Sequence, residues 1–269
     1  MNTDSPQGSG RLLVEHIACI DSTNSELLRR DPLIPPGSAA AALWLVAARQ
    51  TGGRGRRQRH WLSSADASLT ASFAREVDKP GHLGAWSLVA GVAVAETLAG
   101  FGIEVQLKWP NDIHVVDGKV GGILCEARAR GKSTRIVIGC GLNLQPPAGA
   151  AALDQPVAGL FTAGTGPGRD LMGAALGCAL LAATDQLLAE GFAAFRERWR
   201  ARDMLQSRPI MIHDYAGVAG HSVAAVARGI DHDGALLVET PDRPGALQRL
   251  LAEEVSVRPH APYPCRPAG

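Results

Sequence analysis

The close spacing of turns between residues 105 and 141 constrains the fold of this chain more than any other feature. Short apolar segments alternate there with turn residues, at Pro110-Asn111-Asp112 and again at Asp117-Gly118. Connections of this length join antiparallel strands, because a parallel pair needs a crossover of a dozen or more residues. Helical segments flank this region in the sequence. The pattern predicts an α+β fold, a mixed sheet with helices, rather than a doubly wound parallel sheet.

Strands are expected where short apolar runs are bounded by turn residues, at 11–20, 39–48, 69–74, 105–109, 114–116, 122–127 and 135–141. The first is predicted to be buried and the second to be central in its sheet. Helices are expected just after Asp21, over 83–99, over 169–188 and over 192–202. Thr23 and Glu26 have the spacing of a capping box, and Ser22 can also cap the first helix. Residues 145–168 are predicted to form a surface loop.

After Gln206 the sequence pattern changes to short strand segments without helices between them. Short strands are expected at 209–215, 223–230, 235–239 and 255–258, and Asp233-Gly234 is a strong hairpin signal between two of them. This spacing predicts a small β-barrel. The chain is therefore expected to divide into a larger unit over 11–204 and a smaller one over 205–260.

Composition excludes several classes of protein. A net charge of +1 argues against a protein that holds nucleic acid along its whole surface. The five cysteines are scattered and the eight histidines form no HxxxH or HExxH pair, so a zinc site is not predicted. The first ten residues lack a signal pattern, and the longest apolar run, Ala39 to Ala48, is too short to cross a bilayer. A cytoplasmic protein that does not enter a membrane is expected.

The segment from Gln50 to Trp61 holds four arginines and three glycines within eight residues. Glycine lets a backbone approach a ligand closely, and arginine offers forked donors to carboxylate and phosphate. A solvated basic loop or a nucleic-acid patch would have the same composition. The segment alone therefore leaves an anion site and a nucleic-acid site equally open.

Three further segments could carry chemistry. Lys108 ends an apolar strand beside Pro110-Asn111-Asp112, where it is either fixed in a cleft or simply exposed. Lys119 precedes two glycines that open a strand, which fits a bulge as well as a ligand. Gly139-Cys140-Gly141-Leu142-Asn143 looks like half a phosphate loop, but no GxGxxG pattern and no Walker lysine follow.

Together with Asp21-Ser22-Thr23-Asn24, these segments resemble the biotin–protein ligase family in their order and spacing. The resemblance continues through 227–231 and 234–239 and covers roughly residues 12–258. It implies a class II synthetase-like catalytic domain of the biotin–lipoate ligase type over 11–204 and a C-terminal SH3-like barrel over 205–260. Bifunctional relatives carry a helix-turn-helix domain before the catalytic domain, and only residues 1–10 precede the first expected strand here. A monofunctional enzyme that does not bind DNA is therefore expected.

The resemblance also implies roles for individual residues. Lys108 and Arg56 are the implied catalytic residues. The implied biotin site consists of Ser22, Thr23, Asn24, Gln50, Arg54, Gly55, Arg56 and Lys108. The implied nucleotide site consists of Arg56, Arg57, Arg59, Trp61, Lys119 and Asn143. Some members stack adenine on a tryptophan in the loop after the Asn143 segment; here that loop has none, and Leu160 or Phe161 is the nearest candidate.

The implied reaction has two steps. Biotin and ATP, with Mg²⁺ carried by the ATP, give biotinyl-5′-AMP, and a lysine of a biotin carboxyl carrier protein then takes the biotin. The basic loop is expected to be mobile until it closes over the adenylate. Lipoate–protein ligase is one alternative, although its Arg-Arg, triple-glycine and His-Asp signature is absent. A nucleic-acid-binding protein that uses the basic loop is an alternative of another class.

Overall fold

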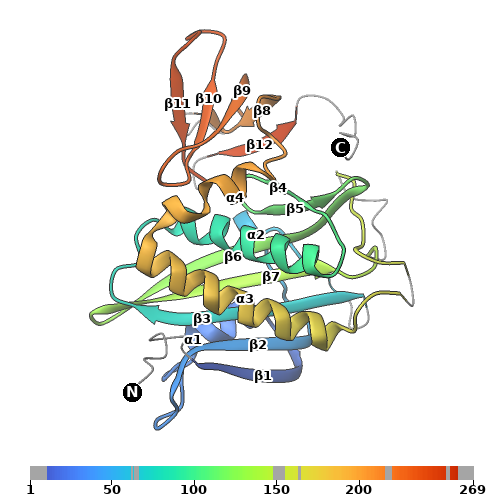
Figure 1. Ribbon diagram of the computed structural model, residues 1–269, viewed down its shortest axis with the longest axis vertical. Helices are drawn as coiled ribbons and strands as arrows, with labels where there is room; N and C mark the ends of the chain where they lie inside the picture. The colour runs from blue at the N-terminus through green and yellow to red at the C-terminus, as the bar shows by residue number, and fades with distance from the viewer. Residues whose placement is uncertain are drawn as a thin grey trace, which may run out of the picture.

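The computed structural model describes residues 11–61, 63, 67–147, 155–162, 165–215, 220–252 and 255–259. Two β-sheets organise this part of the chain: one of seven strands that includes the N-terminal strand, and one of five strands at the C-terminal end (Figure 1). Cys265, the first ten residues and the last ten lie outside the described residues. The expected α+β class with a mixed sheet is confirmed.

The large sheet has the strand order β1-β2-β3-β7-β6-β5-β4. Its strands are β1 (Arg11–Ile20), β2 (Ala40–Gln50), β3 (Ser68–Val77), β4 (Gln106–Lys108), β5 (Asp112–Val115), β6 (Gly118–Arg130) and β7 (Ser133–Asn143). Only β1 and β2 run parallel, and the other neighbours are antiparallel. The antiparallel run from β4 to β7 is the one that the turn spacing predicted.

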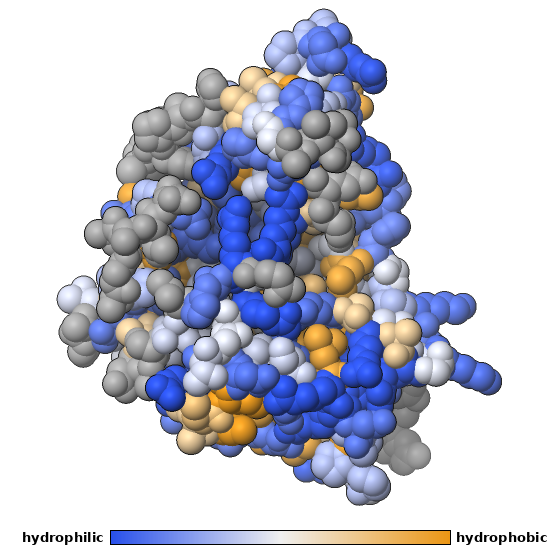
Figure 2. All heavy atoms as spheres, turned by 180° about the vertical axis from the view of Figure 1, so that it is seen from behind, coloured by the Kyte–Doolittle hydropathy of each residue, from blue (hydrophilic) through white to orange (hydrophobic). Residues whose placement is uncertain are grey.

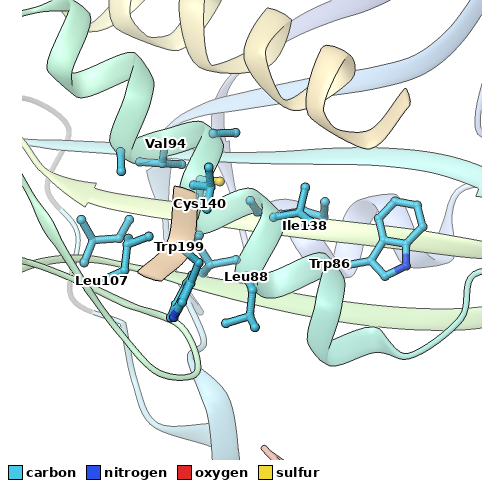
Figure 3. Close-up of a cluster of buried hydrophobic side chains, with 14 of the residues drawn as sticks. Trp86, Leu88, Val94, Leu107, Ile138, Cys140 and Trp199 are labelled. Carbon is cyan, nitrogen blue, oxygen red and sulfur yellow. The ribbon is translucent and has the colours of Figure 1, made fainter. Parts of the chain in front are cut away.

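One face of this sheet is covered by α2 (Leu83–Gly100) and α3 (Arg169–Glu190), which pack on each other in front of the strands (Figure 1). Alternate residues of the strands point to this face, and in β2 they are Ala42, Trp44 and Val46. Figure 3 shows the cluster that they join, with Trp86 and Leu88 of α2 beside Ile138 of β7. Both helices are long and apolar enough to cross a membrane, but 67% and 50% of their apolar windows are buried inside the protein. They therefore have the burial of core helices.

The opposite face carries the short helix α1 (Thr23–Arg29), which packs over β2, β3 and β7. Leu27 of α1 contacts the other set of alternate residues, which includes Leu43 and Leu45 of β2. The predicted capping box is wrong by one position. Ser22 is the N-cap, with its hydroxyl accepting the Ser25 N–H at 3.4 Å, and Thr23 points inward instead.

The structure differs from the sequence-based expectations in the burial of β1, and it also locates β2 and the loop at 145–168. β1 was expected to be buried, but none of its residues is, because it is an edge strand with a single neighbour. β2 lies one strand in from that edge and is buried over most of its length. The predicted loop at 145–168 contains no strand or helix in its described residues, while 148–154 and 163–164 lie outside them.

The small sheet has the order β11-β10-β9-β8-β12 and is antiparallel throughout. Its strands are β8 (Pro209–His213), β9 (Ser222–Ile230), β10 (Leu236–Glu239), β11 (Leu247–Leu250) and β12 (Ser256–Pro259). The predicted hairpin is present between β9 and β10, where Gly234 has φ +86° and Asp231 Oδ1 accepts the N–H groups of Asp233 and Ala235. Sequence analysis missed β11.

The two sheets meet beside the end of β4. A 3-10 turn (Phe192–Phe195) and α4 (Arg196–Arg200) follow α3 and lead the chain back to this strand. Leu107 then accepts a hydrogen bond from Met204 N and donates one to Arg202 O. The Trp109 indole N–H donates to Gly234 O across the joint at 3.0 Å. The C-terminal sheet is thereby fixed next to Lys108.

Candidate active site

A cavity of about 450 Å³ opens on the α1 side of the large sheet and extends to β12 of the small sheet. Seen from that side, hydrophilic side chains gather around a hollow in the upper half of the molecule (Figure 2). Every residue that the sequence predicted for the site lines this cavity: Ser22, Thr23, Asn24, Gln50, Arg54, Gly55, Arg56, Arg57, Arg59, Trp61, Lys108, Lys119 and Asn143. The structure thus brings together segments that are far apart in the sequence.

The parallel pairing of β1 with β2 assembles the first wall. Ile20 pairs with Gln50, so the chain that follows β1 lies next to the end of β2. Gln50 Oε1 accepts the Thr23 backbone N–H at 2.7 Å and lies 3.0 Å from the Thr23 hydroxyl. Because a backbone N–H can only donate, the orientation of the Gln50 amide is fixed. This wall offers neutral hydrogen-bonding groups to a ligand.

The Asn24 side chain forms hydrogen bonds with three other residues of the protein. Its amide nitrogen donates to Leu124 O at 3.1 Å and to Glu126 Oε2 at 2.8 Å, and its amide oxygen lies 2.6 Å from the Ser72 hydroxyl. Gly139 must be a glycine, because a Cβ there would collide with the Asn24 amide. Asn24 therefore ties α1 to the floor of the cavity.

The basic loop folds back on itself. Trp61 N donates to Gly53 O at 2.9 Å, Gly55 N donates to Arg59 O at 2.7 Å, and Arg57 takes a left-handed φ of 55°. The Trp61 ring lies against Gly141, where an added Cβ would be 2.5 Å from the ring. The alternate glycines of β7 thus make room for Asn24 and Trp61, so the likeness to half a phosphate loop is misleading.

The arginines of this loop are held from two directions. Arg54 donates to Ser25 Oγ at 2.9 Å and pairs with Glu126 at 3.4 Å. Arg56 donates to Ala252 O, and Arg57 pairs with Asp214 at 2.5 Å. Both of these partners belong to the C-terminal part of the chain. Sequence analysis missed them, because they lie more than 150 residues away and no local pattern marks them.

Lys108 is buried in the cavity wall rather than exposed at a strand end, with 7% of its surface accessible. Its Nζ lies 3.2 Å from Asp112 Oδ2, and Lys119 Nζ lies 2.6 Å from Asp112 Oδ1. Burial by itself raises the pKa of Asp112, but the two ammonium groups outweigh it and hold that pKa well below its usual range. Asp112 is therefore an anion that bridges and aligns two lysines.

Of the site residues that sequence analysis missed, Asp112 had the clearest signal in the sequence. It stands in the quoted Pro-Asn-Asp turn, and the β4–β5 hairpin places it directly opposite Lys108. Asn111 fastens this turn, since its side chain donates to Ile123 O at 2.7 Å and its carbonyl accepts the Ile123 N–H at 2.9 Å. The signal was a lysine and an aspartate four residues apart on either side of a tight turn, which predicts that their side chains lie close together.

The cavity is strongly cationic. Among the described residues that line it, Asp112 is the only carboxylate, whereas the lysines and arginines are Arg54, Arg56, Arg57, Arg59, Lys108, Lys119 and Arg258. Such an excess of positive charge in a partly enclosed site favours an anionic ligand. Arg258 comes from β12, so the small sheet contributes charge as well as walls.

Asn143 ends β7 and is 3% exposed. Its amide nitrogen donates to Ala158 O at 3.3 Å, while its buried Oδ1 has no hydrogen-bond partner among the described residues. Leu160 and Phe161, the nearest candidates for an adenine platform, pack against the core and are not among the residues that line the cavity. Trp61 is an aromatic ring that does line it.

Comparison with known proteins gives one consistent result. The Biotin/lipoate A/B protein ligase family matches residues 17–143. The bifunctional ligase/repressor BirA of Salmonella typhimurium is 34% identical over 93% of this chain and 75% of its own length. A biotin–[acetyl-CoA-carboxylase] ligase of Paracoccus denitrificans is 32% identical over 84% of this chain and 93% of its own. The biotin protein ligase of Aquifex aeolicus, solved with biotin and ATP, has the same fold with a TM-score of 0.74, 22% identity, and coverage of 92% and 99%.

Proposed function

The chain belongs to the biotin/lipoate A/B protein ligase family and is a ligase, and from this premise we propose a two-step reaction. Biotin and MgATP give biotinyl-5′-AMP and pyrophosphate, and a lysine of a biotin carboxyl carrier protein then receives the biotin. One observation carries this proposal: a single cavity joins a neutral hydrogen-bonding wall at Thr23 and Gln50 to a cationic wall at Lys108 and the basic loop. A ligand with a neutral polar ring at one end and an anionic group at the other fits that division.

In the first step, a carboxylate oxygen of biotin forms a bond to the α-phosphorus, and the bond to the departing pyrophosphate breaks. Both reactants are anions, so their approach requires nearby positive charge. Lys108 is buried and aligned by Asp112, which suits it to contact both groups. A charge-assisted hydrogen bond of this kind contributes about 1.5–3 kcal/mol, which corresponds to roughly a tenfold to hundredfold change in rate.

The nucleotide is assigned to the rest of the cationic wall. Arg56, Arg57, Arg59 and Lys119 would bind phosphates, with Mg²⁺ entering as part of MgATP. The Trp61 ring would stack on adenine, as aromatic side chains do with nucleobases. Asn143 Oδ1, which lacks a partner among the described residues, would accept a hydrogen bond from the adenine amino group.

In the second step, the carrier lysine amine forms a C–N bond to the biotinyl carbonyl carbon, loses a proton, and AMP departs. No protein nucleophile is required. Cys140 is the one cysteine among the described residues that line the cavity, and burial raises the pKa of its thiol to about 12. A protonated thiol is a poor nucleophile, which supports direct transfer without a covalent enzyme intermediate.

We also propose a catalytic domain over 11–204, a C-terminal domain over 205–260, and a location in the cytoplasm. The separate strand orders of the two sheets support the division. The four cysteines in the described part of the chain are free thiols, which is compatible with a reducing compartment.

The test is incubation with biotin, MgATP and a biotin carboxyl carrier domain, followed by an avidin blot. We expect a labelled carrier, and an unlabelled carrier would overturn the proposal. Lys108→Ala should release pyrophosphate roughly tenfold to a hundredfold more slowly than the wild type. Lys132→Ala is the matched control, since Lys132 is exposed in the turn between β6 and β7 and should leave the rate unchanged.

A further inference from the structure

Ser72 lies on β3 beneath the neutral wall of the cavity and is completely buried. Its hydroxyl oxygen lies 2.6 Å from Thr23 Oγ1 and 2.6 Å from Asn24 Oδ1. Thr23 Oγ1 in turn lies 3.0 Å from Gln50 Oε1. Four oxygen atoms thus form a chain of three contacts that begins at a buried amide and ends at the cavity.

The two ends of this chain can only accept hydrogen bonds. Asn24 Oδ1 is fixed as an oxygen because the amide nitrogen must be the atom that faces Leu124 O and Glu126 Oε2. Gln50 Oε1 is fixed as an oxygen because it faces the Thr23 backbone N–H. Neither amide can be flipped without placing two donors or two acceptors against each other.

This chain of oxygen atoms has fewer hydrogens than contacts. Each short oxygen–oxygen contact needs one hydrogen between its atoms, and only the Ser72 and Thr23 hydroxyls can supply one. Two hydrogens therefore serve three contacts. The Ser72 hydrogen is the one available to Asn24 Oδ1, so Ser72 and Gln50 compete for the hydrogen of Thr23.

A ligand can resolve this competition. An N–H group that donates to Gln50 Oε1 releases the Thr23 hydroxyl to donate to Ser72. The two 2.6 Å contacts then each hold a hydrogen, and the longer contact at 3.0 Å, which borders the cavity, can open. A ligand oxygen in the same place could not donate to Gln50 Oε1, so two acceptor oxygens would face each other with no hydrogen between them.

We propose that Ser72 is a positioning residue that determines substrate specificity. By drawing the Thr23 hydroxyl toward itself, it opens the second lone pair of Gln50 Oε1, beside the one that accepts the Thr23 backbone N–H, to a ligand N–H. The site then selects a cyclic urea, which carries ring N–H groups, over rings that carry none. This role for Ser72 rests on the proposed biotin ligase function and adds a residue that makes no contact with the substrate.

The experiment compares biotin with its two cyclic carbamate analogues, in each of which one ring N–H is replaced by oxygen. Calorimetry without ATP gives the affinities for the wild type, Ser72→Ala and Thr184→Ala. Thr184 is the matched control, because its hydroxyl is also fully buried but lies on α3, across the sheet. An unpaired acceptor in a buried site lowers affinity by roughly tenfold or more.

We expect wild type and Thr184→Ala to prefer biotin over at least one analogue by about tenfold or more. In Ser72→Ala, the Thr23 hydroxyl can turn and donate to the ring oxygen, so this preference should shrink to within about threefold. A purely structural role would weaken both ligands equally and leave the ratio unchanged. An unchanged ratio overturns the inference.

The wild-type comparison keeps the inference testable if Ser72→Ala does not fold, since a wild-type ratio near one for both analogues also overturns it. Failure of this inference is distinguishable from failure of the proposed function. If the protein labels the carrier with biotin but binds biotin and both analogues with nearly equal affinity, only the role of Ser72 is refuted. A protein that binds neither biotin nor the analogues refutes both.

Discussion

Replacing Asp203 with asparagine should stabilise this protein at neutral pH. Asp203 lies at the joint between the two sheets, where it pairs with Leu107 in the strand that carries Lys108. Its Oδ1 accepts the Leu205 N–H at 2.8 Å, but its Oδ2 is buried and has no hydrogen-bond partner among the described residues. Burial raises the pKa of this carboxyl to about 6, against the smaller opposing effect of backbone hydrogen bonds.

The direction of the pH effect follows from this pKa. The folded protein favours the neutral carboxyl, so its contribution to stability is fully present below pH 3.8, the ordinary value, and is lost as the pH rises through about 6. Each unit of pKa difference corresponds to about 1.4 kcal/mol, so ionisation destabilises the folded state by about 3 kcal/mol above pH 7. Asparagine keeps the Oδ1 acceptor and carries no charge, so the variant avoids this loss.

Urea denaturation at two pH values measures the effect. At about pH 7.5, the free energy of unfolding of Asp203→Asn should exceed that of the wild type by about 3 kcal/mol, and at about pH 5 by roughly half as much. Asp78→Asn is the control, since Asp78 is exposed, and it should change stability by about 0.5 kcal/mol or less. A difference for Asp203→Asn that is absent, or equal at both pH values, would refute the reasoning.

Two other variants test how the cavity is held together. Gly141→Ala places a methyl group 2.5 Å from the Trp61 ring, which must then move; calorimetry should show ATP binding weakened roughly tenfold and biotin binding little changed. Unaltered ATP affinity would contradict the role given to Trp61. Asp214→Asn removes the ion-pair partner of Arg57, so amide hydrogen exchange over 53–59 should quicken in the free protein, and the KM for ATP should rise about twofold to fivefold. Exchange that matches the wild type would mean that Asp214 does not restrain the loop. Asp242→Asn is the control, because Asp242 is exposed in the turn between β10 and β11.

Most elements of the large sheet could be predicted because their signals are local. The helix expected over 83–99 is α2 (Leu83–Gly100), and the strand expected over 135–141 lies within β7 (Ser133–Asn143). β11 was missed because its residues, LQRL, include two polar side chains in a short edge strand. Only its pairing with β10 makes that segment a strand, and pairing is not a local property.

The candidate site was predicted as a set of residues but not as an arrangement. Lys108 and the basic loop could be recognised because their motifs are contiguous in the sequence. Ser72 and Asp214 could not, because each lies in a segment with no distinctive pattern and gains its partner only when distant segments meet. Glu126 ends the distinctive segment that begins at Lys119, but only the tertiary structure brings it to Asn24. The packing of Leu160 and Phe161 against the core could not be predicted for the same reason, since the direction of a loop side chain depends on the core beneath it.

The sequence by itself determined the order of the elements, the α+β class and the residue types that gather at one site. Apolar periodicity, turn residues and contiguous motifs are enough for that, because each acts within a few residues. The tertiary structure alone decided that Lys108 is buried beside Asp112, that Gly139 and Gly141 make room for Asn24 and Trp61, and that the network ending at Gln50 is one hydrogen short. A hydrogen bond is lost when its donor and acceptor move about an ångström apart, and only the packing of distant strands sets atoms to that precision.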